Sequence, residues 1–490
     1  MKDNNKDLSM TKNTMTLGST YAVPCIYPQI KEARSNRSDQ CAQASNPLTV
    51  QVPGSKSITN RALLLATLAE GTSTLRGVLF SDDSRHFLKC IQDLGFETTV
   101  DEETKVITVN GHGGEVPLKE ASQYVGSAGT AARFLTAYLG ISNGLYHMDA
   151  SEQMRKRPMA PLLDSLKELG CEILYTNSES PANTDTTEGN FREGYFREGY
   201  FREGFFPFTL RSHGFGQDHI TINIDHSSQF LSALLIASCL SEKDFTVNVE
   251  GTHGMAYIEM TRKMMAQFGV TVDTPTSDSF VTKAGQSYQA LDYQIEPDVS
   301  AACYFYAMAP LLHIPVMVEH VHFDSLQGDV AFIHILEKMG CIATDTPQGI
   351  LLTPPAKEGF SGVTVDMSAC SDQAITLAAI APFADSPTKI TGIGHIRFQE
   401  SNRIHAICTE LARMGIRCEE GEDNITIYPG TPAPSVVNTY EDHRMAMGFS
   451  LIGLRSEGIV IDNPACCRKT FENYFTVLES VIDTLNPSSL

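Results

Sequence analysis

Hydrophobic positions recur along the chain in six similar blocks. Each block opens with a helix of small apolar residues behind a polar N-terminus, and a turn and a β-rich run follow it. A second helix comes next, and in five blocks it ends in a hydrophobic residue followed by Gly, the residue favoured where a helix stops. The pattern predicts an α/β fold of six repeated units. Their first helices start near Asn60, Ala131, Ser228, Ser300, Asp372 and Arg444.

The two kinds of helix differ in the spacing of their apolar residues. First helices such as NRALLLATLA are apolar nearly all round, which predicts that they are buried. Second helices such as LLDSLKELG place apolar residues at i, i+3, i+4 and i+7, so we expect one face to be exposed. The 490 residues exceed what one hydrophobic core usually holds. We therefore expect two domains of three units each, divided near the segment DYQIEPDVS.

Two segments interrupt this pattern. Residues 1–46 are polar and aperiodic, which predicts a flexible N-terminal tail. The segment NFREGYFREGYFREGFFPF contains a tandem five-residue repeat whose Arg and Glu charges cancel locally. We interpret residues 189–206 as a surface loop enlarged by repeat slippage.

Charge and cysteine usage narrow the function. The formal net charge of −21 argues against nucleic acid as a partner, and any anionic substrate then needs locally clustered cations. No apolar run reaches the ~18 residues of a membrane span, and the N-terminus lacks the apolar segment of a signal peptide. The twelve cysteines form no C-x-x-C pair and lie mostly in apolar segments. We expect a cytoplasmic protein without a metal site.

Polar clusters precede or begin the first helix of every block. The segment VPGSKSITNR is one of them, but its Gly54 precedes Lys56 by two positions, which does not fit the P-loop spacing. Helix N-termini attract anions, so six clusters pointed at one crevice would form an anion-binding cavity. Ordinary N-capping is the alternative for any single cluster. The clusters include Lys56, Ser57 and Arg61; Gly129 and Arg133; Ser227, Ser228 and Gln229; Asp298; Asp372; and Asp442, His443 and Arg444.

Motifs along the chain resemble those of the 5-enolpyruvylshikimate-3-phosphate (EPSP) synthase family. In order, between about residues 47 and 485, they are GSKSITNRALLLATLAEG, GSAGTAARFLTAYL, RPMAPLLDSLKELG, SSQFLSALL, SLQGD, QESNRIHAICTELARMG, YEDHRMAMGFSLIGL and KTFENYF. The sister family that acts on UDP-N-acetylglucosamine usually has Asn where this chain has Ser57. The resemblance implies the two-domain enolpyruvyl transferase fold, with three βαβαββ-type units per domain. It places residues 47–55 and 298–490 in one domain, here called domain 1, and residues 56–297 in the other, domain 2.

The resemblance also implies the reaction. The family transfers the enolpyruvyl group of phosphoenolpyruvate to the 5-hydroxyl of shikimate 3-phosphate in aromatic amino-acid biosynthesis, without cofactor or metal. We expect a monomer that binds these two small molecules. Family motifs assign catalysis to Lys56, Asp372 and Glu400. They assign shikimate 3-phosphate to Lys56, Ser57, Arg61, Ser227, Ser228, Gln229, Tyr257 and Asp372, and phosphoenolpyruvate to Lys56, Gly129, Arg133, Gln229, Arg403, His443, Arg444 and Lys469.

Five positions depart from the family pattern: Ser127, Gln153, Gly254, His395 and Gln399. Gln153 stands in place of an Arg and Gln399 in place of a Lys, and the nearby Arg155 and Arg397 are candidates to compensate. Two alternatives stay open. The chain could be a paralogue with another acceptor or weak activity, or a non-catalytic anion-binding relative.

Overall fold

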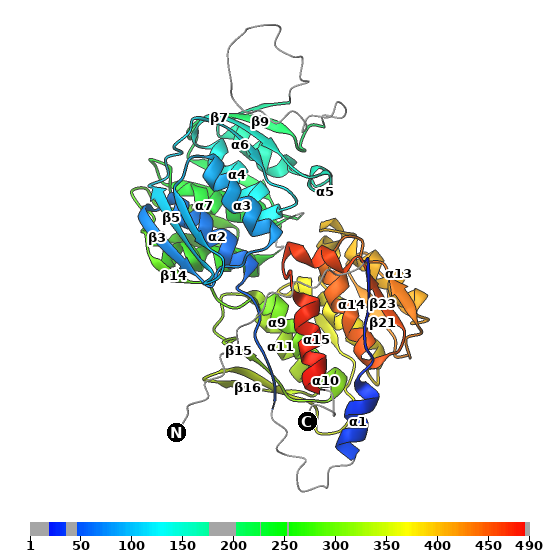
Figure 1. Ribbon diagram of the computed structural model, residues 1–490. Coiled ribbons are helices and arrows are strands. Elements are labelled where there is room, and N and C mark those ends of the chain that lie inside the picture. Colours follow the sequence, from blue (N-terminus) through cyan, green and yellow to red (C-terminus); the bar gives the residue numbers. More distant parts are fainter. Residues whose placement is uncertain (1–18, 36–46, 176–201, 226, 252–253, 486–490) are drawn as a thin grey trace, which may run out of the picture.

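The structure is a computed structural model that describes residues 19–35, 47–175, 202–225, 227–251 and 254–485. Its buried hydrophobic side chains form two clusters, which correspond to the two lobes of Figure 1. One cluster runs from Ile58 to Ile295. The other joins residues between Tyr21 and Val50 to residues between Val299 and Ile482. The α/β fold is confirmed, and the residue bounds of domains 1 and 2 stay a prediction.

Domain 2 contains three small mixed sheets and seven helices among its described residues. The sheets have the strand orders β14-β3-β5-β4, β6-β7-β9-β8 and β10-β11-β13-β12. The strands are β3 (Glu70–Arg76), β4 (Thr98–Asp101), β5 (Val106–His112), β6 (Glu120–Tyr124), β7 (Asn143–Asp149), β8 (Glu172–Leu174), β9 (Phe208–His213), β10 (His219–Asn223), β11 (Phe245–Glu250), β12 (Val272–Thr276), β13 (Ser279–Thr282) and β14 (Asp292–Gln294). The helices are α2 (Lys56–Leu68), α3 (Asp82–Asp93), α4 (Gly129–Gly140), α5 (Glu152–Arg155), α6 (Ala160–Glu168), α7 (Gln229–Ser238) and α8 (Met255–Gln267).

Domain 1 repeats this plan with the strand orders β16-β17-β15-β2, β18-β19-β21-β20 and β1-β23-β22. Its strands are β1 (Thr20–Ala22), β2 (Leu48–Val50), β15 (Val316–Glu319), β16 (Ile342–Thr346), β17 (Gly349–Thr353), β18 (Thr364–Asp366), β19 (Thr388–Thr391), β20 (Cys418–Glu420), β21 (Ile425–Ile427), β22 (Ser435–Val437) and β23 (Ile459–Asp462). Its α-helices are α1 (Tyr27–Ser35), α9 (Val299–Tyr306), α10 (Met308–Leu312), α11 (Ala331–Lys338), α12 (Ala374–Ile380), α13 (Arg403–Arg413), α14 (His443–Arg455) and α15 (Tyr474–Leu485). Short 3-10 helices are η1 (Gly328–Val330), η2 (Ser371–Gln373), η3 (Ala381–Phe383), η4 (Gly394–Phe398) and η5 (Pro464–Lys469).

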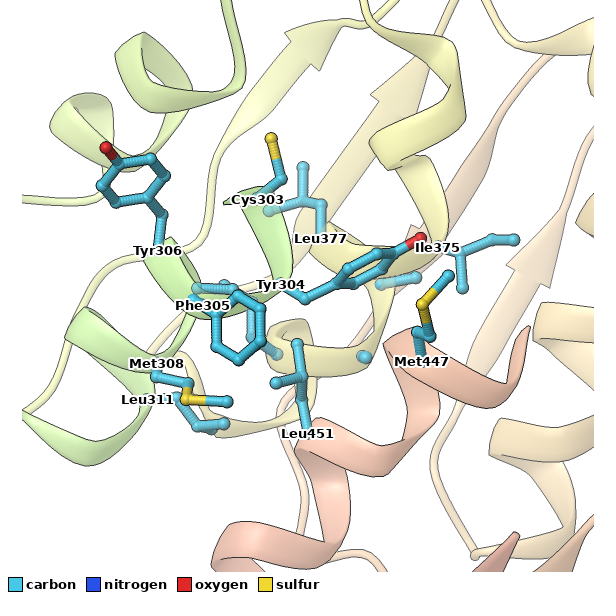
Figure 2. Close-up of a cluster of buried hydrophobic side chains, with 14 of the residues drawn as sticks. Cys303, Tyr304, Phe305, Tyr306, Met308, Leu311, Ile375, Leu377, Met447 and Leu451 are labelled. Atoms are coloured by element: carbon cyan, nitrogen blue, oxygen red, sulfur yellow. The ribbon is translucent and has the colours of Figure 1, made fainter. Parts of the chain in front are cut away.

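The first helix of each repeated unit is buried at the centre of its domain, as its all-round apolar sequence predicted. Helices α2, α4 and α7 fill domain 2, and every residue of α4 is buried. Helices α9, α12 and α14 do the same in domain 1. Figure 2 shows aromatic side chains of α9 packed with Met447 and Leu451 of α14 and with Ile375 of α12. This packing fixes where each helix N-terminus points.

The chain passes between the domains twice, and the two passages lie side by side. Ser55 N–H donates to the Glu296 carbonyl at 2.8 Å, and Asp298 N–H donates to the Pro53 carbonyl at 2.8 Å. Gly54 and Pro297 form an isolated antiparallel bridge there. A Cβ on Gly54 would lie 2.0 Å from the Gly77 carbonyl oxygen, so only glycine allows this close approach.

The expectation of a flexible tail is wrong for residues 19–35. Strand β1 pairs antiparallel with β23 and completes the third sheet of domain 1. Ile30 of α1 is buried in the core of domain 1, and the Arg455 guanidinium lies 4.2 Å from the ring centre of Tyr27. A three-residue strand is too short to show periodicity, and its partner is more than 400 positions away. Residues 1–18 and 36–46 lie outside the described residues.

The predicted loop insertion, residues 189–206, is wrong at its C-terminal end. Residues 189–201 lie outside the described residues, but the segment from residue 202 onward packs on domain 2. Glu203 forms an ion pair of 3.0 Å with Lys167, and the Gly204 carbonyl accepts a 2.8 Å hydrogen bond from Met159 N–H. Phe206 is buried in the domain 2 core. The last repeat therefore contributes to the folded domain.

Candidate functional site: a cation-lined cavity between the domains

Helix N-termini from both domains open into one cavity. Domain 2 contributes the start of α2, α4 and α7, and domain 1 contributes η2 and the start of α13 and α14. The cavity is lined by Lys56, Ser57, Arg61, Asp83, Gly129, Thr130, Arg157, Ser227, Ser228, Gln229, Tyr257, Ser371, Asp372, Gln399, Glu400, Arg403, His443 and Arg444. Of the fifteen site residues predicted from the sequence, thirteen are in this lining. The other two, Arg133 and Lys469, lie directly behind it.

The side chains that line the cavity have a positive net charge, whereas the whole chain has a negative one. Five cationic side chains and three carboxylates line it, whereas the chain carries a formal charge of −21. The N–H groups of the helix starts add partial positive charge in the same place. The cavity therefore suits ligands that carry phosphate and carboxylate groups.

Lys56 stands at the first position of α2, next to the crossing between the domains. Ser55 caps the helix by accepting from Ile58 N–H, and this fixes where the Lys56 side chain leaves the backbone. The Lys56 ammonium lies 3.5 Å from the buried Asp83 carboxylate. Asp83 lies in the first turn of α3, where an acidic residue is expected simply because it interacts favourably with the helix dipole. The contact between Asp83 and the site could therefore not be predicted from the sequence.

Arg61 is buried and makes three hydrogen bonds within its own domain. Its guanidinium donates to the Thr261 hydroxyl at 2.8 Å, to the Ser57 carbonyl at 3.0 Å and to the Tyr257 carbonyl at 3.3 Å. Burial lowers the pKa of Arg61 to about 10. It holds the Ser57 and Tyr257 backbone in place while one edge faces the cavity.

Gly129 and Gln229 lie together on the domain 2 wall. The Arg133 guanidinium donates to the Gly129 carbonyl at 3.3 Å from behind. The Gln229 side-chain oxygen is buried without a hydrogen-bond partner among the described residues. An unpartnered buried acceptor at a cavity wall is an anchoring point for a ligand hydroxyl or ammonium donor.

Tyr257 joins the two walls. Its hydroxyl donates a 3.0 Å hydrogen bond to the Asp372 carboxylate across the domain boundary. Burial, together with nearby carboxylates, raises the pKa of Tyr257 well above its usual range, so this hydroxyl keeps its proton.

Asp372 is held by two arginines of its own domain. Its carboxylate accepts from Arg444 at 2.7 Å and from Arg403 at 2.9 Å. Burial would raise the pKa of Asp372, but the two guanidinium groups outweigh it and lower the pKa to about 2. The group is therefore a carboxylate at neutral pH, able to accept a proton.

Glu400 is surrounded by three cations. Arg403 donates to it at 2.8 Å, the Lys469 ammonium lies at 3.0 Å, and the Arg157 guanidinium reaches it from domain 2 at 3.9 Å. Burial opposes ionisation, but Lys469 and the two arginines hold the pKa of Glu400 well below its usual range. Lys469 thus belongs to the site through Glu400 even though it does not line the cavity.

Asp442 organises Arg403 and Arg444. It belongs to the polar cluster that precedes α14, but the family motifs assigned it no role in the site. Asp442 is fully buried and accepts from Arg403 Nε at 2.8 Å and from Arg444 N–H at 3.0 Å. His443 lines the cavity, and neither of its ring nitrogens has a hydrogen-bond partner among the described residues. Burial and the Lys56 charge lower the pKa of His443, so the ring is neutral.

The departures from the family pattern now have positions. Gln399 lines the cavity, whereas Gln153, Ser127 and His395 are outside the lining. Gly254 has φ +68°, and a Cβ there would lie 2.4 Å from the Ser228 hydroxyl. A left-handed residue this close to Ser228 favours glycine.

Neither predicted substitute cation enters the cavity lining. Arg155 binds Asp149 with two hydrogen bonds, 2.9 and 2.7 Å long. Arg397 binds Glu420 at 2.7 Å and the Gly421 carbonyl at 2.6 Å. Arg157 lines the cavity instead. The missed signal was its place before Pro158, in the RPMAPL motif, between α5 and α6.

Fold and site together define a two-domain transferase of the enolpyruvyl type. The structure is similar to EPSP synthase from Acinetobacter baumannii, with a TM-score of 0.70 and 24% identity over 88% of this chain and 95% of that chain. The family profile described as EPSP synthase (3-phosphoshikimate 1-carboxyvinyltransferase) matches residues 44–193 and 200–478. The chain belongs to the EPSP synthase family.

Curated relatives agree with this assignment. The 3-phosphoshikimate 1-carboxyvinyltransferase of a Nostoc species is 43% identical over 89% of this chain and 96% of its own length. The chloroplastic enzyme of the same name from Arabidopsis thaliana is 37% identical over 88% of this chain and 82% of its own length. The resemblance read from the motifs and the enolpyruvyl transferase fold are confirmed.

Proposed function

We propose that the chain transfers the carboxyvinyl group of phosphoenolpyruvate to the 5-hydroxyl of shikimate 3-phosphate and releases phosphate. Family membership supports this activity. One observation about the site carries the proposal: Lys56 and Tyr257 of domain 2 meet Asp372 and Glu400 of domain 1 in a single cation-lined cavity. A transferase for two polyanions needs this combination of acid/base groups and positive charge.

Shikimate 3-phosphate is assigned to the part of the cavity around the Tyr257–Asp372 hydrogen bond. The residues proposed to contact it are Lys56, Ser57, Arg61, Ser227, Ser228, Gln229, Tyr257 and Asp372. Phosphoenolpyruvate is assigned to the part around Glu400 and the arginines. The residues proposed for it are Lys56, Gly129, Arg133, Gln229, Arg403, His443, Arg444 and Lys469, to which we add Arg157. Lys56 and Gln229 lie between the two groups.

The addition step needs one base and one acid. Asp372 accepts the proton of the 5-hydroxyl as the hydroxyl oxygen bonds to C2 of phosphoenolpyruvate. Lys56 donates a proton to C3, and this gives a tetrahedral intermediate. The C2–O bond to phosphate then breaks, C3 returns a proton to the enzyme, and phosphate leaves. Glu400 is the second carboxylate candidate for the proton transfers at C3.

Substrate binding is expected to activate Asp372. Arg403 and Arg444 now hold its pKa at about 2, which makes it a weak base. Phosphate and carboxylate groups of the substrates compete for the same guanidinium groups. Each arginine that turns toward a substrate removes a charge that lowers the Asp372 pKa, so its basicity rises when the site is filled.

We further propose that the enzyme acts as a monomer in the cytoplasm and has no nucleic-acid partner. The free cysteines of the described chain, most of them buried, support a reducing compartment. Among the described residues, helices long and apolar enough to cross a membrane are absent.

Phosphate release is the test of the activity. The purified chain is incubated with shikimate 3-phosphate, with phosphoenolpyruvate, and with both. The proposal expects phosphate only when both are present. Release at a low rate with shikimate 3-phosphate, but a high rate with another hydroxylated acceptor, would favour a paralogue. Binding of either substrate in calorimetry without any phosphate release would favour a non-catalytic anion-binding relative.

A further inference from the structure

A buried carboxylate outside the cavity forms hydrogen bonds with the loop between β22 and α14, which leads into the site. Glu410, two turns after Arg403 on α13, is fully buried. Its carboxylate accepts from the Tyr440 hydroxyl at 2.8 Å, from Asn438 N–H at 3.2 Å and from Arg413 at 2.8 Å. Neither Glu410 nor Tyr440 lines the cavity. Their hydrogen bond therefore acts on the loop between β22 and α14, not on a ligand.

That loop has an unusual backbone. Tyr440 and Glu441 have φ values of 54° and 55°, so two consecutive residues with side chains are left-handed. Residues other than Gly, Asn and Asp seldom adopt this conformation, and it persists only where surrounding contacts enforce it. Asp442 N–H closes the turn across these two residues by donating to the Thr439 carbonyl at 2.8 Å. Side-chain contacts then hold the turn in place: the Glu410 bonds, and a hydrogen bond from Tyr440 N–H to the Asn438 side chain at 2.8 Å.

The residue that follows the two left-handed positions is Asp442. Its buried carboxylate accepts from Arg403 at 2.8 Å, from the Ser401 hydroxyl at 3.0 Å and from Arg444 N–H at 3.0 Å. It thereby fixes the Arg403 side chain and the first turn of α14. A change at 440–441 would move Asp442 and, through it, both arginines.

We propose that Glu410 and Tyr440 are positioning residues for the arginine pair. Helix α13 holds the 438–442 loop at two points seven residues apart, which lie on the same face of a helix. Arg403 binds Asp442 at the first point and Glu410 binds Tyr440 at the second. The second contact keeps residues 440 and 441 left-handed, so that Asp442 presents Arg403 and Arg444 to the cavity.

The first test compares two Tyr→Phe substitutions that each remove one buried hydroxyl of domain 1. Tyr440→Phe removes the bond to Glu410, and the control Tyr306→Phe removes a 3.0 Å bond to the Ile350 carbonyl, away from the cavity. If Tyr440 is a positioning residue, Tyr440→Phe should raise the KM for phosphoenolpyruvate roughly tenfold. This change corresponds to the loss of about one hydrogen bond to a charged group. The Tyr306→Phe variant should keep that KM and lose a similar amount of thermal stability.

The second test uses rescue. Glycine adopts positive φ without strain, and Glu441 is exposed. The double variant Tyr440→Phe/Glu441→Gly should have a KM for phosphoenolpyruvate close to the wild-type value. The single variant Glu441→Gly should leave this KM nearly unchanged. Glu410→Gln keeps an acceptor for Tyr440 without the charge, so its KM should fall between wild type and Tyr440→Phe. An unchanged KM in Tyr440→Phe, or no rescue by Glu441→Gly, would overturn the proposal.

The inference rests on the proposed function only for the KM readout. Hydrogen exchange of the 438–446 backbone needs no activity, and it should speed up in Tyr440→Phe but not in Tyr306→Phe. Faster exchange in a chain that releases no phosphate would refute the proposed reaction and keep the loop assignment. Unchanged exchange in an active enzyme would refute the loop assignment alone.

Discussion

The Tyr257 hydroxyl donates a 3.0 Å hydrogen bond to the Asp372 carboxylate, and this bond joins domain 2 to domain 1 inside the cavity. A second contact between the domains, from Arg157 to Glu400, is longer, at 3.9 Å. Both contacts pair a group proposed for substrate binding with a proposed acid/base carboxylate. Closing the domains and completing the site are therefore the same event in this geometry.

Tyr257→Phe tests the cross-domain bond. A hydrogen bond to a charged acceptor contributes about 1.5–3 kcal/mol, so we expect the KM for shikimate 3-phosphate to rise at least roughly tenfold. Tyr288→Phe is the matched control, since it removes a buried hydroxyl of domain 2 that donates to the Ile236 carbonyl at 2.8 Å. Steady-state kinetics on both variants decides the matter, and equal KM values would show that the Tyr257 hydroxyl does not matter for this substrate.

Lys56→Ala should abolish turnover while the protein stays folded. Its ammonium lies 3.5 Å from Asp83, and solvent cannot replace a positioned proton donor there. The loss expected for such a group is ~100-fold or more in kcat. The exposed Lys243, mutated to Ala in the same way, serves as the control. A Lys56→Ala enzyme that keeps over half the wild-type rate would remove Lys56 from the catalytic assignment.

Much of this architecture could be predicted because the same physical pattern occurs six times. A single polar cluster before an apolar helix can be either a ligand site or an ordinary N-cap. The cluster at Ser55–Lys56 shows this, because Ser55 is the N-cap of α2. The repetition at α14, where Asp442 caps the helix and Arg444 faces the cavity, resolves the ambiguity. Periodicity of this kind is local information, so a single sequence contains it.

Side-chain direction could not be predicted, because distant contacts determine it. Arg155 and Arg157 are two positions apart, yet one binds Asp149 and the other reaches Glu400 in the opposite domain. The position of strand β1 depends on an unpaired edge of β23 that forms more than 400 residues later. Glu400, which Arg157 reaches, and strand β23, which pairs with β1, are far away in the sequence, so no short sequence window contains these partners.

Gly129→Ala should weaken phosphoenolpyruvate binding with little effect on the fold. An added Cβ would lie 3.0 Å from Arg157 Nη1 and 3.3 Å from Arg133 Nη1. Both neighbours are the ends of long side chains, so they can shift, but the shift displaces cations proposed to bind phosphoenolpyruvate. We expect the KM for phosphoenolpyruvate to rise about tenfold, a loss of about 1.4 kcal/mol, with the melting temperature nearly unchanged. A folded variant with the wild-type KM would show that these two arginines tolerate the methyl group.

Asp329 makes stability depend on pH in a defined direction. Burial, with the neighbouring Asp372 carboxylate, raises the pKa of Asp329 to about 6, whereas an unfolded Asp has a pKa of about 3.9. Between these values the folded protein holds a proton that the unfolded chain has lost. This group's contribution to the free energy of unfolding therefore falls as pH rises through that window, and it stays low above it.

Asp329→Asn should remove that dependence. The variant's melting temperature relative to wild type should rise between pH 4 and pH 7, and the gain in unfolding free energy should not exceed roughly 3 kcal/mol. Asn can keep the partners of Asp329, the Ser300 hydroxyl at 2.8 Å and the Gln373 amide at 3.2 Å. Asp324→Asn, on the exposed surface, is the control. Parallel curves for wild type and Asp329→Asn would contradict the assignment.

Gln399→Lys should strengthen phosphoenolpyruvate binding. Gln399 lines the cavity where the family pattern has a Lys, and Arg397 is held by Glu420 and the Gly421 carbonyl, so it cannot compensate. The neighbouring Glu400 already has three cationic partners. A new ammonium would therefore add positive charge available to a substrate anion, with hydrogen bonds roughly twice as strong as neutral ones. The KM for phosphoenolpyruvate should fall by up to about tenfold, which corresponds to about 1.4 kcal/mol. Gln217→Lys, on the exposed surface, adds the same charge outside this cavity and should leave the KM unchanged. If Gln399→Lys leaves the KM in place or raises it in a folded enzyme, the missing Lys does not limit anion binding in this protein.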